Sequence, residues 1–269
     1  MKILYKVFFT RTASLTLLIV GALSACGKIG EHPPSPFFEY DDGHDEKALS
    51  LAIDDLDTKY DLPSRLFIAQ YYLSRYMRTG DASNAANLKK YYRGVGSLED
   101  LSRSNKVYDE LMWLGKYLDA AILLYVDKKP DAAKTLLDSY CPMSDFNKKM
   151  GCHADHIEYF DDSAQTSLSR DNLEKAFIQI SVVGDVYHYE GAVGHALWLL
   201  AQYDVAYAEK RAESFRARNP WNDFVMTEYC HVADQYRDSA VEDHEKYAAA
   251  YNRSNCRLYV DSTPTGLPE

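Results

Sequence analysis

The sequence contains little of what builds a β-sheet protein. Its 269 residues include only 13 glycines and 9 prolines, and runs of Val, Ile and Thr are rare. Helix-favouring Ala, Leu, Lys and Glu are plentiful, so we expect an all-α fold. With 46% hydrophobic and 26% charged residues, the chain is too apolar to be wholly disordered and is long enough to bury a sizeable core.

Positive charge is also in short supply. The 30 Lys and Arg residues stand against 40 Asp and Glu residues, which gives the chain a net charge of -10. Binding to a nucleic-acid backbone needs clustered positive charge. We therefore predict that nucleic acid is not a partner.

The common signatures of catalytic sites are missing. The sequence contains no HExxH, no GxSxG and no GxxxxGK phosphate loop. Adjacent acids occur at Asp41-Asp42 and Asp161-Asp162, but such pairs usually lie in exposed turns, and an acid–base pair needs two different environments. We predict no enzyme activity and no cofactor, and keep a hydrolase as an alternative.

His153 and His156 are weak candidates for metal ligands. Their spacing places both on one face of a helix, with acidic residues nearby. The candidates for a third ligand are His188, His195 and His231. Two ligands do not make a site, so we predict no metal and expect a solvated, polar helix at this segment.

The apolar run near the N-terminus is too short to cross a membrane. Residues 13–22 span about ten positions, whereas a transmembrane helix needs roughly 20. Lys2, Lys6 and Arg11 precede the run, and the first acidic residue is Glu31. This arrangement predicts a cleaved secretory signal peptide.

The end of this signal, Leu23-Ser24-Ala25-Cys26, resembles the lipobox of bacterial lipoproteins. The resemblance implies cleavage before Cys26 and acylation of its sulfur and its new amino group, and three acyl chains anchor a protein stably. Gly27 stands where an Asp retains enteric lipoproteins in the inner membrane. The resemblance therefore implies an outer-membrane anchor with the body facing the periplasm. An ordinary signal peptide followed by a chance cysteine is the alternative.

The chain divides into four expected segments. They are a signal peptide (1–25), a lipidated cysteine with a proline-rich tether (26–46), a single α-helical domain (47–260) and a C-terminal tail (261–269). Loss of the signal peptide removes three positive charges and changes the net charge from -10 to -13. A body of this charge is repelled by anionic headgroups, so the lipid alone would hold it at the membrane.

The tether is expected to be extended because it is rich in proline and lacks a helical period. Its prolines are Pro33, Pro34 and Pro36. It also contains the aromatic residues Phe37, Phe38 and Tyr40. We expect these three side chains to dock on the body and not on a partner.

Apolar residues recur every three or four positions from Asp45 onward, which predicts roughly nine or ten helices. Pro63 suits the first turn of a helix that stops near Gly80, and Asp81 or Ser83 caps the next one. The expected helices span residues 49–56, 63–80, 81–92, 97–129, 130 onward, 153–164, 169–181, 191–218, 221–237 and 239–256.

One segment, residues 116–141, resembles a tetratricopeptide hairpin. Ala121 and Ala133 occupy the two small-residue positions at which the helices touch, and the large positions hold Leu124, Leu137 and Tyr140. The resemblance covers about 26 residues and implies a degenerate helical-repeat solenoid. An irregular helical bundle is the alternative.

The remaining cysteines predict two disulfides, because their number is even and the chain is addressed to an oxidising compartment. They are Cys141, Cys152, Cys230 and Cys256. Three pairings are possible, and proximity favours Cys141 with Cys152 and Cys230 with Cys256. A zinc site is a weaker interpretation, because Cys141 and Cys152 lack close-spaced further ligands of the usual kind.

The sequence is rich in tyrosine, with 22 in all. Tyrosine is enriched where one end of the side chain is buried and the other contacts water, as in binding grooves. The candidates for partner contact are Tyr71, Tyr72, Tyr76, Tyr91 and Tyr92. Packing between helices is the alternative for each.

These observations favour a membrane-anchored helical adaptor that holds another envelope protein. An immunity or inhibitor lipoprotein that neutralises a periplasm-targeted toxin is a second hypothesis, which the acidic body suits. An envelope hydrolase is a third, and it requires a deep cleft with converging acids or histidines.

Overall fold

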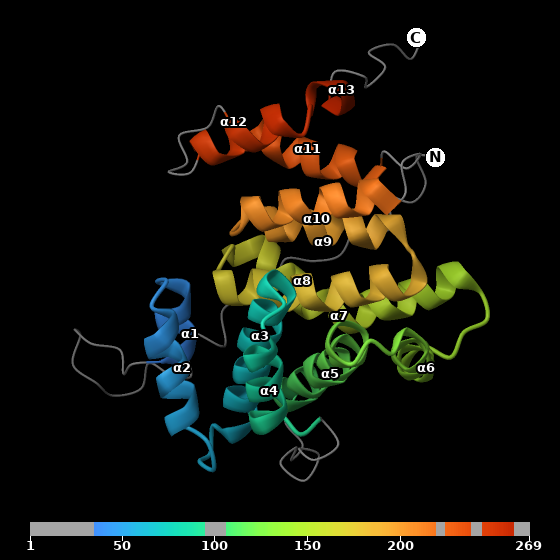
Figure 1. Cartoon of the computed structure of the whole chain (residues 1–269). Coiled ribbons are helices and arrows are strands. Elements are labelled where there is room, and N and C mark those ends of the chain that lie inside the picture. The colour runs from blue at the N-terminus through green and yellow to red at the C-terminus, as the bar shows by residue number, and fades with distance from the viewer. Residues whose placement is uncertain (1–34, 95–105, 219–223, 238–243, 261–269) are drawn as a thin grey trace. The chain divides into compact units, whose positions relative to one another are not determined.

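The computed structural model describes residues 35–94, 106–218, 224–237 and 244–260. All of them belong to the second of two compact units, Ser35–Glu269. They form thirteen α-helices and one π-helical segment, with no strand inside these ranges, so the all-α prediction is confirmed (Figure 1). None of the described helices is both long and apolar enough to cross a membrane. The predicted signal peptide, Cys26 and the tail 261–269 lie outside the described residues.

The first part of the described chain contains helices of very different lengths. They are α1 (Pro36–Asp41), α2 (Asp45–Asp54), α3 (Asp61–Thr79), α4 (Ala82–Tyr91), α5 (Lys106–Ala121), the π-helical segment η3 (Ile122–Val126) and α6 (Pro130–Tyr140). The expectation of an extended tether up to residue 46 is wrong for residues 36–41, which form α1, and for residues 45–46, which begin α2. Pro36 stands at the start of α1, where its fixed φ and missing N–H suit a helix.

The second part contains α7 (Phe146–Ser167), α8 (Arg170–Tyr187), α9 (Glu190–Ala201), α10 (Val205–Arg218), α11 (Phe224–Arg237), α12 (His244–Arg253) and α13 (Arg257–Val260). The single helix expected over residues 191–218 is therefore two helices. Asp204 separates them, and its carboxylate accepts a hydrogen bond from the backbone N–H of Tyr207 at 3.0 Å. An acidic side chain that caps a new helix in this way favours a break over continuation.

The boundary between α3 and α4 is the one that the sequence predicts. Gly80 follows α3 with a φ of 71°, the left-handed conformation that glycine adopts without steric cost. Asp81 then caps α4, because its carboxylate accepts a hydrogen bond from the N–H of Ser83 at 2.8 Å.

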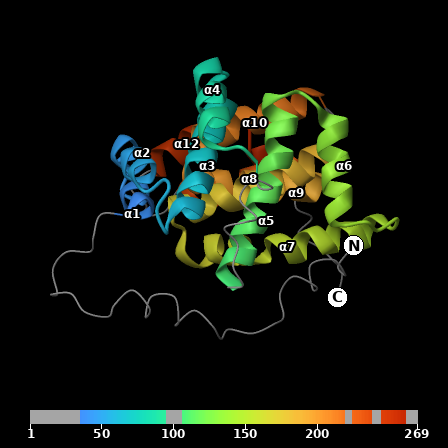
Figure 2. The same ribbon diagram turned by 90° about the horizontal axis from the view of Figure 1, so that it is seen from below.

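Helix α8 lies in the middle of the described residues and packs against α1, α3, α5, α6, α7 and α9 (Figures 1 and 2). It even buries Glu174, which accepts hydrogen bonds from the Tyr40 hydroxyl at 2.6 Å and from Gln70 at 3.2 Å and pairs with Arg78 at 3.3 Å. A buried carboxylate needs such partners. Because Tyr40 belongs to α1, the network joins α1 to the body, as expected, whereas Phe38 remains exposed.

Small residues mark two close helix contacts. A Cβ at Gly184 on α8 would lie 2.9 Å from the backbone nitrogen of Val193 on α9, so only glycine fits there. Ala121 and Ala133 are fully buried, and α5 and α6 lie side by side (Figure 2). These are the positions at which the hairpin resemblance expects small residues.

Candidate functional site

The segment between α6 and α7 is closed on itself by a disulfide. Cys141 follows α6 directly, Cys152 lies in the second turn of α7, and their Cα atoms are 5.9 Å apart. We call residues 141–152 the clipped loop; its second half, residues 146–152, forms the first two turns of α7. Cys230 and Cys256 form the second disulfide, so both pairs are those that proximity favours.

The clipped loop presents apolar side chains within a polar setting. Met143 is 40% exposed and Phe146 is 45% exposed. The Phe146 ring meets Tyr189 edge to face with centroids 5.5 Å apart. Asp145 caps α7 by accepting a hydrogen bond from the N–H of Lys148 at 2.9 Å. The loop is thus constrained by the disulfide and by a helix cap.

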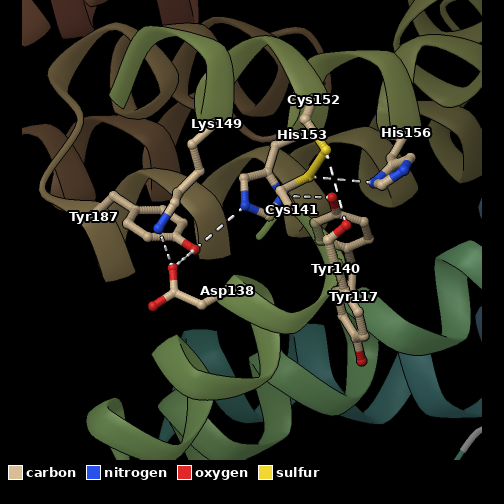
Figure 3. The surroundings of a disulfide bond; sticks show 9 residues. All are labelled: Tyr117, Asp138, Tyr140, Cys141, Lys149, Cys152, His153, His156 and Tyr187. Atoms are coloured by element: carbon tan, nitrogen blue, oxygen red, sulfur yellow. Dashed lines mark hydrogen bonds and ion pairs between the residues drawn. A yellow bond between two sulfur atoms is a disulfide. The ribbon is translucent and has the colours of Figure 1, made fainter. Parts of the chain in front are cut away.

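His153, the residue that follows the clipped loop, is buried and supports the loop through its contacts. His153 is only 1% exposed, and its Nδ1 lies 2.7 Å from the Tyr117 hydroxyl while its Nε2 lies 3.3 Å from the Tyr187 hydroxyl (Figure 3). Burial, with smaller contributions from His156 and Lys149, lowers the pKa of His153 to about 4. The imidazole is therefore neutral at pH 7, with one nitrogen donating and the other accepting. The expectation of a solvated helix is wrong at His153.

The same network continues to an ion-paired carboxylate. The Tyr187 hydroxyl donates to Asp138 at 2.9 Å, and Asp138 also pairs with Lys149 at 2.5 Å (Figure 3). Lys134 pairs with the same carboxylate, also at 2.5 Å. Burial by itself raises the pKa of Asp138, but these hydrogen bonds outweigh it and hold the pKa well below its usual range. Because Asp138 lies on α6, and Lys149 and Tyr187 lie on α7 and α8, the carboxylate ties three helices together.

His156 lies on the other side of the disulfide. Its Nδ1 is 3.7 Å from the Cys141 sulfur, and its ring stacks on Trp113 with centroids 3.8 Å apart. Burial lowers the pKa of His156. The ligand atoms of Cys141, Cys152 and His156 lie within 4.8 Å of one another. In the disulfide state neither sulfur is a thiolate, so this cluster has no anionic sulfur ligand to offer a metal.

The other histidine and acid candidates do not join this cluster. His195 pairs through its Nε2 with Asp161 at 2.7 Å, on α9 and α7. His188 follows α8 in the left-handed conformation, and His231 is exposed on α11. None of the three is brought to His153 as a third ligand by the described part of the chain.

The tyrosines predicted to contact a partner are mostly core residues. Tyr71, Tyr72 and Tyr92 are buried, and the Tyr92 hydroxyl donates to the carbonyl of Gly115 at 2.9 Å. Tyr91 is half-buried and stacks on Tyr72, with an interplanar angle of 4°. Tyr76 is half-buried too. The prediction of a tyrosine-lined partner surface is wrong for the three buried residues, because helix packing covers them.

Several residues of the site carry no local sequence signal. Trp113 and Tyr117 come from α5, Asp138 from α6 and Tyr187 from α8. They meet His153 and His156 only when the helices pack. One signal was present in the sequence: Met143, Phe146 and Met150 stand among mostly polar residues between two cysteines.

The chain matches no protein-family model, no curated protein and no solved structure.

Proposed function

We propose that the chain is a bacterial lipoprotein that serves as a helical adaptor in the cell envelope. Acyl chains on Cys26 would attach it to a membrane, with the outer membrane favoured by Gly27 and the body facing the periplasm. The anchor is supported by the positively charged residues at the start of the chain, by the short apolar run that follows them and by the lipobox-like residues 23–26. The acidic body supports attachment through lipid instead of through its surface.

The clipped loop is the surface that we assign to partner binding. The observation that carries this assignment is the exposure of Met143 and Phe146 on a loop that is constrained before any partner arrives. A constrained loop loses little conformational entropy on binding, and an aromatic side chain that enters a pocket is a frequent energetic anchor. Lys148 and Asp145 are both exposed beside them. We therefore expect a folded envelope protein with an apolar pocket.

The anchor is tested by metabolic labelling with an alkyne-bearing fatty acid in a bacterial host. The natural chain should incorporate the label, and Cys26→Ala should lose it, because that cysteine would carry the acyl groups. Cys152→Ala is the matched control and should keep the label. Labelling that persists in Cys26→Ala would contradict the lipoprotein assignment, as would an unlabelled natural chain released into the periplasm.

The loop is tested by site-specific photocrosslinking in the native host. A benzophenone amino acid in place of Phe146 should give one discrete adduct, whereas the same probe at Tyr159, which is 39% exposed on the same helix, should not. Met143→Ser should weaken the Phe146 adduct. Equal adducts at both positions, or none at Phe146, would contradict the docking loop. An adducted secretion or cell-wall component supports the adaptor, whereas an adducted toxic enzyme supports the inhibitor hypothesis.

A further inference from the structure

The neighbourhood of the first disulfide contains three groups that ligate metals. Cys152 and His156 stand four residues apart on α7, so their side chains share one face of the helix. Cys141 reaches the same place from the end of α6. The sequence separates Cys141 from this pair by eleven residues and a helix boundary, and only the fold brings the three together.

The distances suit a tetrahedral ion. With Zn–S bonds of about 2.3 Å and Zn–N bonds of about 2.0 Å, a sulfur and a nitrogen on one zinc ion lie about 3.5 Å apart, and two sulfurs about 3.8 Å apart. The Cys141 sulfur and the His156 Nδ1 are already 3.7 Å apart. The ligand atoms of all three residues lie within 4.8 Å of one another, and once the disulfide is broken the two sulfurs must move apart to about 3.8 Å.

Neighbouring side chains hold the His156 imidazole in one orientation. Trp113 stacks on its face and fixes the plane of the ring, and the Lys116 ammonium lies 4.0 Å from the centroid of the Trp113 ring. Cys152 and His156 are only partly buried, so an ion can reach the cluster.

We propose that the reduced chain binds a thiophilic divalent cation of the zinc class through Cys141, Cys152 and His156, with water in the fourth position. A dithiol reductant supplies two electrons and two protons to the disulfide and becomes a disulfide itself, which leaves two cysteine thiols. The cation then binds both sulfurs and the imidazole nitrogen, and the two thiol protons are released to solvent. This inference does not depend on the proposed docking function.

The second disulfide provides an internal comparison. Cys230 and Cys256 are both fully buried, and within the described residues they belong to no cluster of metal ligands. If reduced sulfurs alone were sufficient, both pairs would take up metal. If the imidazole matters, only the first pair will.

The experiment uses the chain with Cys26→Ser, reduced by a phosphine without oxygen and then freed of reductant. Zinc is titrated against a chromophoric chelator, and cobalt is used as a spectroscopic probe of thiolate ligation. We expect one zinc per chain, none for the oxidised protein, and a thiolate-to-cobalt charge-transfer band. Alkylation with iodoacetamide, mapped by mass spectrometry, should show zinc protecting Cys141 and Cys152 but not Cys230 and Cys256. This mapping needs no cysteine variant of the body.

A pair of histidine variants tests the third ligand. His156→Phe keeps an aromatic ring on Trp113 but has no ligand atom. It should weaken zinc binding by more than roughly 100-fold, because loss of a mere outer-shell partner already costs about 10- to 100-fold. His195→Phe, which removes the imidazole that contacts Asp161 at 2.7 Å, should leave the affinity unchanged. The proposal is overturned if the reduced chain binds no zinc, if zinc protects both cysteine pairs equally, or if His156→Phe binds as tightly as its parent.

Discussion

The two disulfides have the same chemistry but lie in different surroundings. Cys230 and Cys256 are both fully buried between α11 and the short turn that precedes α13. Cys141 is buried too, but Cys152 is partly exposed and an imidazole lies beside the pair. The first disulfide constrains a loop with exposed apolar side chains, whereas the second joins helices of the core. The difference suggests that the second is mainly a source of stability and the first a means of shaping a surface.

Removal of the second disulfide should have the largest effect on stability. The disulfides span 11 and 26 residues, for which unfolded-state entropy corresponds to about 2.8 and about 3.5 kcal/mol. Cys230→Ala with Cys256→Ala also leaves a cavity in the core, which adds to the cost. Urea denaturation should show a loss of about 4 kcal/mol for this variant and about 3 kcal/mol for Cys141→Ala with Cys152→Ala. A larger loss for the first pair would reverse the comparison.

Lowering the pH should reduce the free energy of unfolding, because it protonates His153 beside the clipped loop. The pKa of His153 falls from 6.5 in the unfolded chain to about 4 in the folded protein, so the unfolded chain binds more protons between these values. The free energy of unfolding is therefore not reduced by His153 above pH 6.5, and it falls as the pH drops from 6.5 towards 4. This amounts to about 2 to 3 kcal/mol at pH 4.5. Urea titrations at pH 7 and 4.5 should show this difference in the natural chain and a smaller one in His153→Phe. An unchanged difference would show that other groups cause it.

Loss of one hydroxyl beneath the loop should have a smaller effect. Tyr117→Phe leaves the buried Nδ1 of His153 without its partner at 2.7 Å, which costs about 1 to 2 kcal/mol. Tyr71→Phe is the matched control, because the buried Tyr71 hydroxyl has no hydrogen-bond partner among the residues that the structure describes. That substitution should change the free energy of unfolding by less than about 0.5 kcal/mol. Equal losses for the two variants would mean that the Tyr117–His153 contact adds nothing.

Sequence reasoning succeeded where the determinant is local. Glycine at position 80 and aspartate at position 81 specify how α3 ends and α4 begins, because each acts through its own backbone conformation or side-chain cap. The disulfide pairing follows from chain proximity in the same way. Even so, proline content misled at Pro36, since a proline at the first position of a helix and one in an extended tether look alike in a sequence.

Burial of polar residues could not be predicted because it depends on distant helices. The sequence around Tyr71 and Tyr72 would look the same whether these residues lined a groove or packed in a core. Their burial is decided by α1, α4 and neighbouring helices, not by their own spacing. His153 is likewise covered by Tyr117 and Tyr187, residues 36 and 34 positions away. A periodic pattern identifies one helix face but not what will cover it.

The smallest expected effect on stability is that of a substitution at the partly exposed Phe146, which we compare with a substitution in the core. Phe146→Ser removes a ring that is 45% exposed and contacts Tyr189 at its edge, so the free energy of unfolding should fall by less than about 0.5 kcal/mol. Phe177→Ser, a fully buried aromatic on α8, should unfold the protein or cost several kcal/mol, since Phe→Ala in a core alone costs about 3 to 5 kcal/mol. If Phe146→Ser also abolishes the crosslink from a benzophenone probe at Met143 while urea denaturation is unchanged, its ring acts on a partner and not on the fold. A marked loss of stability would instead make Phe146 part of the support for the loop.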